Sequence, residues 1–317
     1  MVILGLKFFI VNLIFLLFAA NIDRSGLIKW IMDLCVKKGG RVGFHILLST
    51  IFILSPLYLF PVFLYHLPDI SKRLNKEKTG LSLLMAAVML GSILLPFGNQ
   101  RNLFFSTYFI TMREGFSPLR ELVPHIWLYW VILLVFLNLI AYLLRVEVQD
   151  SLVKTEKVRY QELVLAGITL FFIFPFAMGK LNFLGFTFLT GFLFFAFISK
   201  ETLKRVRWWF LISPAVAIPL SMVPLKTPIP LKGLSMLFIP FISSGFITSD
   251  LSAIIFSSIR MNMPTIIMGV AGGSLLGLWG GFELIYIYFI RKERFEPVLL
   301  SLIGVFVVLL GLLTLKL

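Results

Sequence analysis

Long apolar runs separated by short polar loops make up the pattern of this 317-residue chain. Each of the clear runs holds close to the ~20 residues with which an α-helix crosses a bilayer. These runs are 3–22, 125–144, 162–178, 182–199, 208–222 and 298–315. The segment 23–41 is polar and basic, which indicates a helix at the membrane interface around Trp30. The pattern therefore predicts an all-α polytopic membrane protein.

Four further apolar segments contain residues that break helices. Segments 42–67 and 233–259 carry serine, threonine and proline within their apolar sequence. Segments 81–112 and 265–290 are too long for one clean span and are interrupted by glycines, the first also by Pro96. A bilayer tolerates broken backbone only where protein buries it or where it lines a wet cavity. We therefore expect these segments to surround a functional site.

The two glycine-broken segments contain an internal repeat. Positions 91–98 read Gly-Ser-Ile-Leu-Leu-Pro-Phe-Gly, and positions 273–280 read Gly-Ser-Leu-Leu-Gly-Leu-Trp-Gly, so Gly91 corresponds to Gly273. The separation of these two glycines along the chain is called the repeat offset below. Tyr-Phe-Ile at 108–110 and 288–290 gives a slightly smaller offset, and chance is the alternative because Gly, Ser and Leu are common here. Interrupted segments at matching places in two halves are the best sequence pointer to a transporter's binding site.

The distribution of basic residues favours re-entrant hairpins at 42–67 and 233–259 over single spans. If both segments return to their side of entry, 20 Lys and Arg fall on one side and 7 on the other. With single spans the numbers are 13 and 14. Membrane insertion leaves an excess of basic residues on the cytoplasmic side, as the hairpin arrangement does. The hairpins would then face opposite sides, which predicts an inverted repeat.

The inverted repeat divides the chain at the mixed-charge loop 145–159. The first unit, 1–145, would hold one scaffold helix, a re-entrant hairpin, a broken transmembrane helix and a final helix. The second unit, 146–317, would hold three scaffold helices, followed by the same elements. The expected bounds are hairpin 42–67, broken helix 81–112 and helix 125–144 in the first unit, and hairpin 233–259, broken helix 265–290 and helix 298–315 in the second.

Composition excludes a soluble protein. Apolar residues make up 59% of the chain and charged residues 14%, and the mean hydropathy is +0.99. The net charge of +14 would suggest nucleic acid in a soluble protein. Here the loops carry most of it, so the positive-inside rule accounts for it and no nucleic-acid partner is expected. Cys35 is the only cysteine and the three histidines lie far apart, so no disulfide and no metal cluster is predicted.

Three ionisable side chains lie clearly inside the apolar segments: Arg101, Asp250 and Glu283. Each costs ~2.5–3.5 kcal/mol at the centre of a membrane helix, so each should pair or face water. The repeat offset places Arg101 opposite Glu283, which predicts a charged pair. That pair would either line the substrate site or lock the broken helices together. Asp250 is predicted to be a titrating coupling site, and a carboxylate that caps a helix N-terminus is the alternative.

These segments resemble those of the ion transporter superfamily that includes arsenite permeases, NhaD-type sodium/proton antiporters and citrate and dicarboxylate carriers. Gly-Asn-Gln-Arg-Asn-Leu at 98–103 is similar to Gly-Asn-Pro-Gln-Asn-Leu in the arsenite-permease and NhaD branch. Thr-Ser-Asp-Leu-Ser-Ala at 248–253 stands where the second hairpin of that branch carries Ser-Asn-x-Pro-Ala. Gly-Val-Ala-Gly-Gly at 269–273 resembles the start of its second broken helix.

The resemblance and the repeat together imply a set of ion ligands near the breaks and hairpin tips. No cofactor is expected beyond a bound Na⁺ or H⁺ as coupling ion. The implied ligands are Ser49, Thr50, Gly98, Asn99, Asn102, Ser249, Asp250 and Gly281, with Arg101 and Glu283 as the charged pair.

This chain also departs from the family pattern. Thr50 replaces an acid, Asp250 an asparagine, Arg101 a glutamine and Glu283 a small or amide residue. Two scaffold helices of the family are missing before the first hairpin, so the chain looks N-terminally shortened.

The leading hypothesis is a secondary active transporter of a small inorganic ion or anion across the cell membrane. It would be coupled to protons or sodium and work by alternating access. The alternative is a degenerate protein of the same fold that no longer transports and serves as a membrane subunit or scaffold. A membrane enzyme would need an interfacial catalytic cluster, which the sequence does not indicate. The expected partners are the ion, the lipid bilayer and a second copy, forming a homodimer that covers the surface left by the missing helices.

Overall fold

The computed structural model describes residues 2–112, 117–150, 157–220, 232–256, 263–276 and 280–316. This part of the chain is helical without β-strands, apart from two isolated bridges that pair Val148 with Gly40 and Leu74. Within it, five helical segments are long and apolar enough to cross a membrane. They are Leu4–Ser25, Gly40–Leu57, Pro118–Leu143, Tyr160–Ala177 and Pro297–Leu315. The chain is an all-α membrane protein, as its hydropathy predicted.

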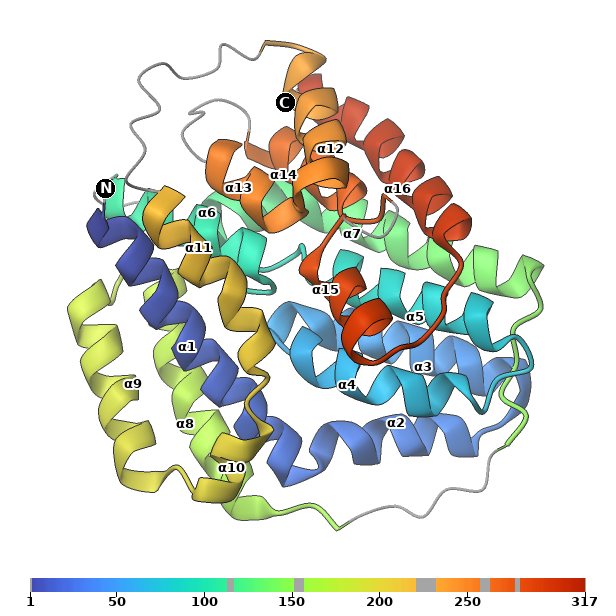
Figure 1. Cartoon of the computed structure of the whole chain (residues 1–317), viewed down its shortest axis with the longest axis horizontal. Helices are drawn as coiled ribbons and strands as arrows, with labels where there is room; N and C mark the ends of the chain where they lie inside the picture. The colour runs from blue at the N-terminus through green and yellow to red at the C-terminus, as the bar shows by residue number, and fades with distance from the viewer. Residues whose placement is uncertain are drawn as a thin grey trace.

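One side of the molecule is a group of helices around α1 (Figure 1). Helices α8, α9, α10 and α11 all pack against α1. The bounds are Val2–Ser25 for α1, Tyr160–Ala177 for α8, Phe183–Phe197 for α9, Lys200–Arg205 for α10 and Ile212–Leu220 for α11. The long helices lie within a few residues of the apolar runs, because a membrane helix needs a continuous apolar stretch. Residues 221 and 222 of the expected third scaffold helix, and Pro224, Pro228 and Pro230 after it, lie outside the described residues.

Two shorter elements, α2 (Leu27–Lys37) and α10, lie at the lower end of the molecule in Figure 1. Helix α2 lies where an interfacial helix was expected, and it buries Ile28, Met32 and Val36. The sequence did not predict α10, because its six residues are mostly polar and too few to show a period. Its first turn is capped by Ser199, whose Oγ accepts a hydrogen bond of 3.1 Å from the backbone N–H of Thr202.

Most of the remaining helices lie on the other side of the molecule, and one of them, α6, also packs against α1 (Figure 1). From the first part of the chain they are α3 (Gly40–Leu54), α4 (Phe60–Ser71), α5 (Glu77–Gly91), α6 (Gln100–Met112) and α7 (Pro118–Leu143). From the second part they are α12 (Ser235–Ile247), α13 (Ser249–Phe256), α14 (Met263–Gly273), α15 (Phe282–Ile285) and α16 (Pro297–Gly311). Helix α6 packs on α13 and α5 packs on α16, so the two parts share one apolar core.

All four interrupted segments are broken within the stretches that the sequence indicated. A 3-10 turn, η1 (Ser55–Leu57), and Tyr58 at φ 60° separate α3 from α4. Thr248 at φ 71° separates α12 from α13. Irregular backbone joins α5 to α6, and it leads from α14 towards α15. The ends of α5 and α14 are separated along the chain by the repeat offset, and so are the starts of α6 and α15.

The first glycine of each repeat allows a close helix contact. A Cβ added at Gly91 would lie 2.4 Å from the carbonyl oxygen of Phe52. A Cβ added at Gly273 would lie 2.3 Å from the carbonyl oxygen of Phe241. Because real Cβ atoms do not approach that closely, only glycine lets α5 rest on α3 and α14 rest on α12 in this way.

The polar loop after α7 contacts both ends of segment 42–67. The N–H of Gly40 donates to the carbonyl of Val148 at 2.9 Å, and the N–H of Val148 donates back at 3.0 Å. Beyond α4, the N–H of Asn75 donates to the carbonyl of Glu147 at 3.1 Å. The entry to this segment and the exit from it therefore lie beside the same loop, which passes the ends of α2 to α5 in Figure 1.

Candidate functional site

Arg101, Asp250 and Glu283 occupy the same position in three helices. Each is the second residue of a helix that begins after a break: α6, α13 and α15, respectively. All three are buried, with at most 3% of their surface exposed. Helix α6 packs on α13, and Asp250 lies within electrostatic range of both other charges. The fold therefore gathers the three intramembrane charges that the sequence singled out.

These charges lack the hydrogen bonds that buried charged groups require. Both carboxylate oxygens of Asp250, Oε2 of Glu283 and Nη1 of Arg101 are buried with no hydrogen-bond partner among the described residues. Nη2 of Arg101 donates to the carbonyl of Met89 at 3.1 Å. That carbonyl lies in the last turn of α5, where helical partners are missing.

The expected direct pair between Arg101 and Glu283 is not formed in this structure. Across the described part of the chain, no salt bridge joins Arg101 to either carboxylate. The physical reason is that α5 ends here, so the carbonyl of Met89 has no helical donor four residues on and accepts instead from the guanidinium and from Oγ of Ser92. Two carboxylates therefore face one arginine, which leaves an excess of negative charge where a proton or a small cation is attracted.

Gly281 lies among the polar groups of the second half. A Cβ added there would be 2.6 Å from Oε2 of Glu283, 3.2 Å from Cε of Met89 and 3.5 Å from Oγ of Ser249. The hydroxyls of Ser249 and Thr248 are also buried without a partner in the described structure. The structure therefore brings three of the predicted site residues, Ser249, Gly281 and Glu283, around one point.

Asn99 and Asn102 hold the break between α5 and α6 together. The side-chain Nδ2 of Asn102 donates to the carbonyls of Ile93 and Leu95 at 2.9 and 3.0 Å. The backbone N–H of Asn102 donates to Oδ1 of Asn99 at 2.8 Å. Nδ2 of Asn99 donates to Oγ of Ser92 at 2.8 Å. These amides replace hydrogen bonds that the broken helix lost. In this structure both predicted ligands are occupied by these contacts.

Gly98 shapes the same turn, and Gly280 shapes its counterpart. A Cβ at Gly98 would lie 2.1 Å from the carbonyl oxygen of Ser92, and a Cβ at Gly280 2.5 Å from that of Ser274. Both serine hydroxyls donate to the carbonyl three residues earlier, at 2.9 and 2.7 Å. The two breaks therefore make the same local contacts, and the corresponding residues, Ser92 with Ser274 and Gly98 with Gly280, are separated by the repeat offset.

Ser49 and Thr50 lie inside α3, before the break rather than at it. Oγ of Ser49 accepts a bond of 3.1 Å from Nδ2 of Asn138 in α7, and Oγ1 of Thr50 accepts one of 3.7 Å from Sγ of Cys35 in α2. In the described structure their hydrogen bonds connect neighbouring helices and do not reach the buried charges. The first break lies further along the chain, at Ser55 to Tyr58.

A polar network that the sequence did not reveal lies beside the charges. Tyr58 is fully buried at the first break, and its hydroxyl donates to Oδ1 of Asn12. Nε2 of Gln100 reaches the same oxygen at 3.4 Å and also donates to the carbonyl of Phe210. Tyr58 is within electrostatic range of both carboxylates. The available signal was Asn12 itself, a lone amide in the middle of an apolar span.

No family model matches this chain, and no curated protein matches its sequence. The resemblance to the arsenite-permease and NhaD branch therefore stays a hypothesis, which rests on the residues of the two breaks and the second hairpin. What the site can do has to be argued from its own charges and geometry.

Proposed function

We propose that this chain is a multi-pass secondary active transporter of a small inorganic ion in the cell membrane, coupled to protons or sodium. The observation that carries the proposal is the set of unpaired buried carboxylate oxygens of Asp250 and Glu283 beside Arg101. A buried charge without partners is strongly destabilising, and a proton or a cation supplies the missing partner. Once a proton or cation has bound to the carboxylates, Nη1 of Arg101 would be available to donate a hydrogen bond to a transported anion.

The same observation weighs against a degenerate scaffold of this fold. Apolar residues in place of a buried ionic cluster are often neutral or stabilising, so a scaffold gains nothing from unpaired carboxylates. A transporter needs groups whose partners come and go, and helix ends at broken segments are where such groups are found. The buried cluster at the first turns of α6, α13 and α15 fits that requirement.

We also propose the inverted repeat with two re-entrant hairpins. One support is the repeat offset, which the helix breaks in segments 81–112 and 265–290 share. A second support comes from the two segments proposed as hairpins. Phe52 and Phe241 contact the matching glycines Gly91 and Gly273, and the number of residues between the two phenylalanines equals the number between the starts of α4 and α13. The loop 145–150 contacts both ends of segment 42–67, as a hairpin that returns to its side of entry requires. Lys72 also forms an ion pair of 3.2 Å with Glu293, and the hairpin arrangement places the loops of both residues on the same, cytoplasmic side.

In this mechanism the helices around α1 are the scaffold, and the broken helices move against them. Asp23 at the end of α1 connects the two groups, because it binds His66 of α4 at 2.9 Å and Arg207 before α11 at 3.0 Å. Arg207 and Arg291 both lie against the ring of Tyr65, at 3.6 and 4.8 Å. Alternating access would break and remake this polar connection while the buried charges stay with the broken helices.

Cysteine labelling tests the hairpin topology. In a Cys35→Ser background, Lys72→Cys and Lys292→Cys should react only from the cytoplasmic side, and Lys232→Cys only from outside, because basic loops stay inside. Arg113 and Lys226, also expected outside, lie beyond the described residues. Labelling of position 72 from outside would contradict the hairpin at 42–67.

A thermal-stability screen of the purified protein tests the ion site. A ligand at 100 times its Kd stabilises the folded state by about 2.7 kcal/mol, so the bound ion should raise the melting temperature. The screen compares Na⁺, Li⁺, K⁺, sulfate and arsenite at several pH values. If no ion and no change of pH shifts the melting temperature, the proposed ion site is wrong.

A further inference from the structure

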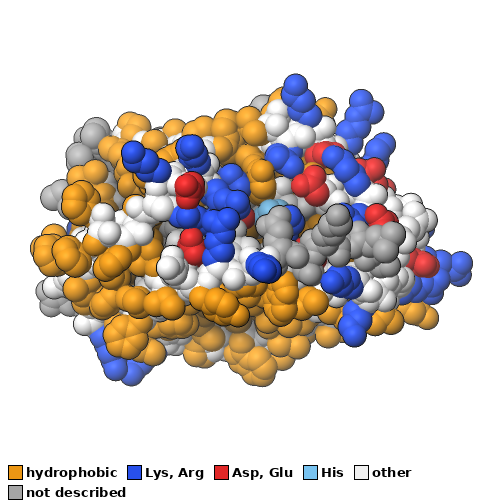
Figure 2. Space-filling view, turned by 90° about the horizontal axis from the view of Figure 1, so that it is seen from below, with side chains coloured by type: hydrophobic (Ala, Val, Ile, Leu, Met, Phe, Trp, Pro, Cys, Tyr) orange, Lys and Arg blue, Asp and Glu red, His pale blue; other side chains and the backbone are white. Residues whose placement is uncertain are grey.

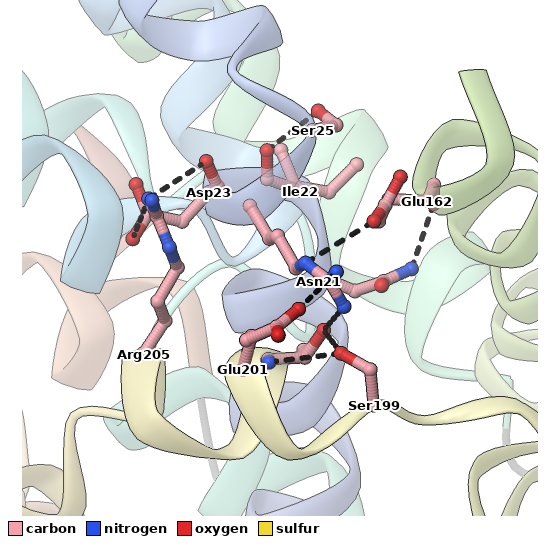
Figure 3. Close-up of polar contacts among 10 residues, drawn as sticks. Asn21, Ile22, Asp23, Ser25, Glu162, Ser199, Glu201 and Arg205 are labelled. Atoms are coloured by element: carbon pink, nitrogen blue, oxygen red, sulfur yellow. Dashed lines mark hydrogen bonds and ion pairs between the residues drawn. The ribbon is translucent and has the colours of Figure 1, made fainter. Parts of the chain in front are cut away.

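A cavity of about 500 Å³ lies between the ends of α1, α8, α9 and α10. None of the three buried charges lines it. Its wall has a polar part and an apolar part. The polar part is Asn21, Arg24, Gln161, Glu162, Ser199 and Thr202, and the apolar part is Val164, Leu165, Ile168, Leu193 and Phe197. Figure 3 labels Asn21, Glu162 and Ser199 of the polar part, together with the neighbouring Glu201 of α10.

The polar part lies at the depth where membrane spans end. The span in α1 ends at Ser25, one residue after Arg24, and the span in α8 begins at Tyr160, two residues before Glu162. Figure 2, which views the molecule from the end where α10 lies, shows Lys and Arg side chains bordered by apolar ones. From this level the apolar wall follows α8 and α9, where Val164 and Phe197 are 62% and 67% exposed. The cavity therefore suits an amphiphile whose polar headgroup lies at the membrane interface and whose apolar chain lies along α8 and α9.

The charges of the polar part decide which headgroup fits. Arg24 binds Oε1 of Glu162 through Nε at 3.2 Å and Oε2 of Glu201 through Nη2 at 2.5 Å. One guanidinium is therefore matched by two carboxylates. Nδ2 of Asn21 donates to the backbone carbonyl of Glu162 at 2.7 Å, so its Oδ1 remains an acceptor. Among the residues that line the cavity, Glu162 is the one carboxylate and Arg24 the one cation, and Glu201 binds Arg24 from outside the lining.

We propose that this cavity binds phosphatidylethanolamine from the bilayer. The primary ammonium would donate to Glu162 and Asn21, the phosphate would approach Arg24, and an acyl chain would follow α8 and α9. A purely anionic headgroup would bring further negative charge next to two carboxylates. A choline headgroup has no N–H to donate to the acceptors. The proposal does not depend on the transport function.

Native mass spectrometry in micelles doped with phosphatidylethanolamine, phosphatidylglycerol or phosphatidylcholine tests the proposal. The wild-type protein should retain phosphatidylethanolamine preferentially. Glu162→Gln should weaken that retention about tenfold, the effect of losing one hydrogen bond between charged groups. The matched control is Glu147→Gln, which also deprives an arginine of its partner, Arg41 at 3.1 Å, but does not line the cavity.

A second variant covers the case in which Glu162→Gln fails to fold. Ile168→Trp fills the apolar part and leaves the ion pairs of Arg24 in place, so it should lose phosphatidylethanolamine while its melting temperature shows that it is folded. Equal retention of the three lipids in wild type would show annular lipid only and overturn the proposal. A preference for phosphatidylglycerol, or unchanged retention in folded variants, would overturn it as well.

Discussion

Replacing Asp250 by asparagine is expected to abolish ion-coupled transport while the protein stays folded. Neither carboxylate oxygen has a hydrogen-bond partner in the described structure, so Asp250→Asn removes a charge without breaking a native hydrogen bond. The amide also relieves the repulsion between two buried carboxylates. Coupled flux in proteoliposomes should therefore fall to the level of empty liposomes, while the melting temperature stays the same or rises.

The matched control is Asp69→Asn, which neutralises an exposed carboxylate of α4. It should leave coupled flux and its pH dependence unchanged. If Asp250→Asn transports with the pH dependence of wild type, Asp250 has no part in the mechanism.

Replacing Arg101 by glutamine should strongly destabilise the protein. It removes the one cation among the described residues that acts on the buried Asp250, and removing one member of a buried charged cluster costs ~3–5 kcal/mol. Glu283→Gln should have a smaller effect, because Arg101 and Asp250 then balance each other. The double variant should recover part of the loss. The measurement is the free energy of unfolding of the two single variants and the double variant, combined as a double-mutant cycle.

An exposed pair provides the control for this cycle. Arg41 and Glu147 lie 3.1 Å apart with side chains 44% and 38% exposed. The corresponding cycle with Arg41→Gln and Glu147→Gln should give ~0–1 kcal/mol, the usual value for solvated pairs. Strict additivity of Arg101→Gln and Glu283→Gln would mean that these two charges do not interact.

The sequence predicted those parts of the fold that depend on local physics. A membrane helix needs a continuous apolar run, so the bounds of the long helices around α1 were predicted to within a few residues. Glycine indicated the breaks after α5 and α14, and the close contact at Gly91 explains why glycine is needed there. Proline was a poorer guide, because Pro175 and Pro240 lie inside helices. Short α10 was missed because six mostly polar residues carry no apolar period.

The candidate site could be predicted only in part, because its contacts join distant residues. A charge in an apolar segment is expensive wherever it lies, so Arg101, Asp250 and Glu283 stood out from the sequence alone. Their hydrogen-bond partners could not be found in the same way. The bond from Arg101 to the Met89 carbonyl depends on where α5 ends, and the bond from Tyr58 to Asn12 joins the break after α3 to the middle of α1.

Uptake by wild-type protein reconstituted in liposomes tests transport most directly. A sodium or pH gradient is imposed across the membrane, and the movement of candidate ions is followed against empty liposomes and against Asp250→Asn. The buried carboxylates predict that wild type uses at least one of the two gradients to move an ion and that the variant uses neither. Folded, reconstituted wild type that moves no ion under either gradient would contradict the proposed transport function.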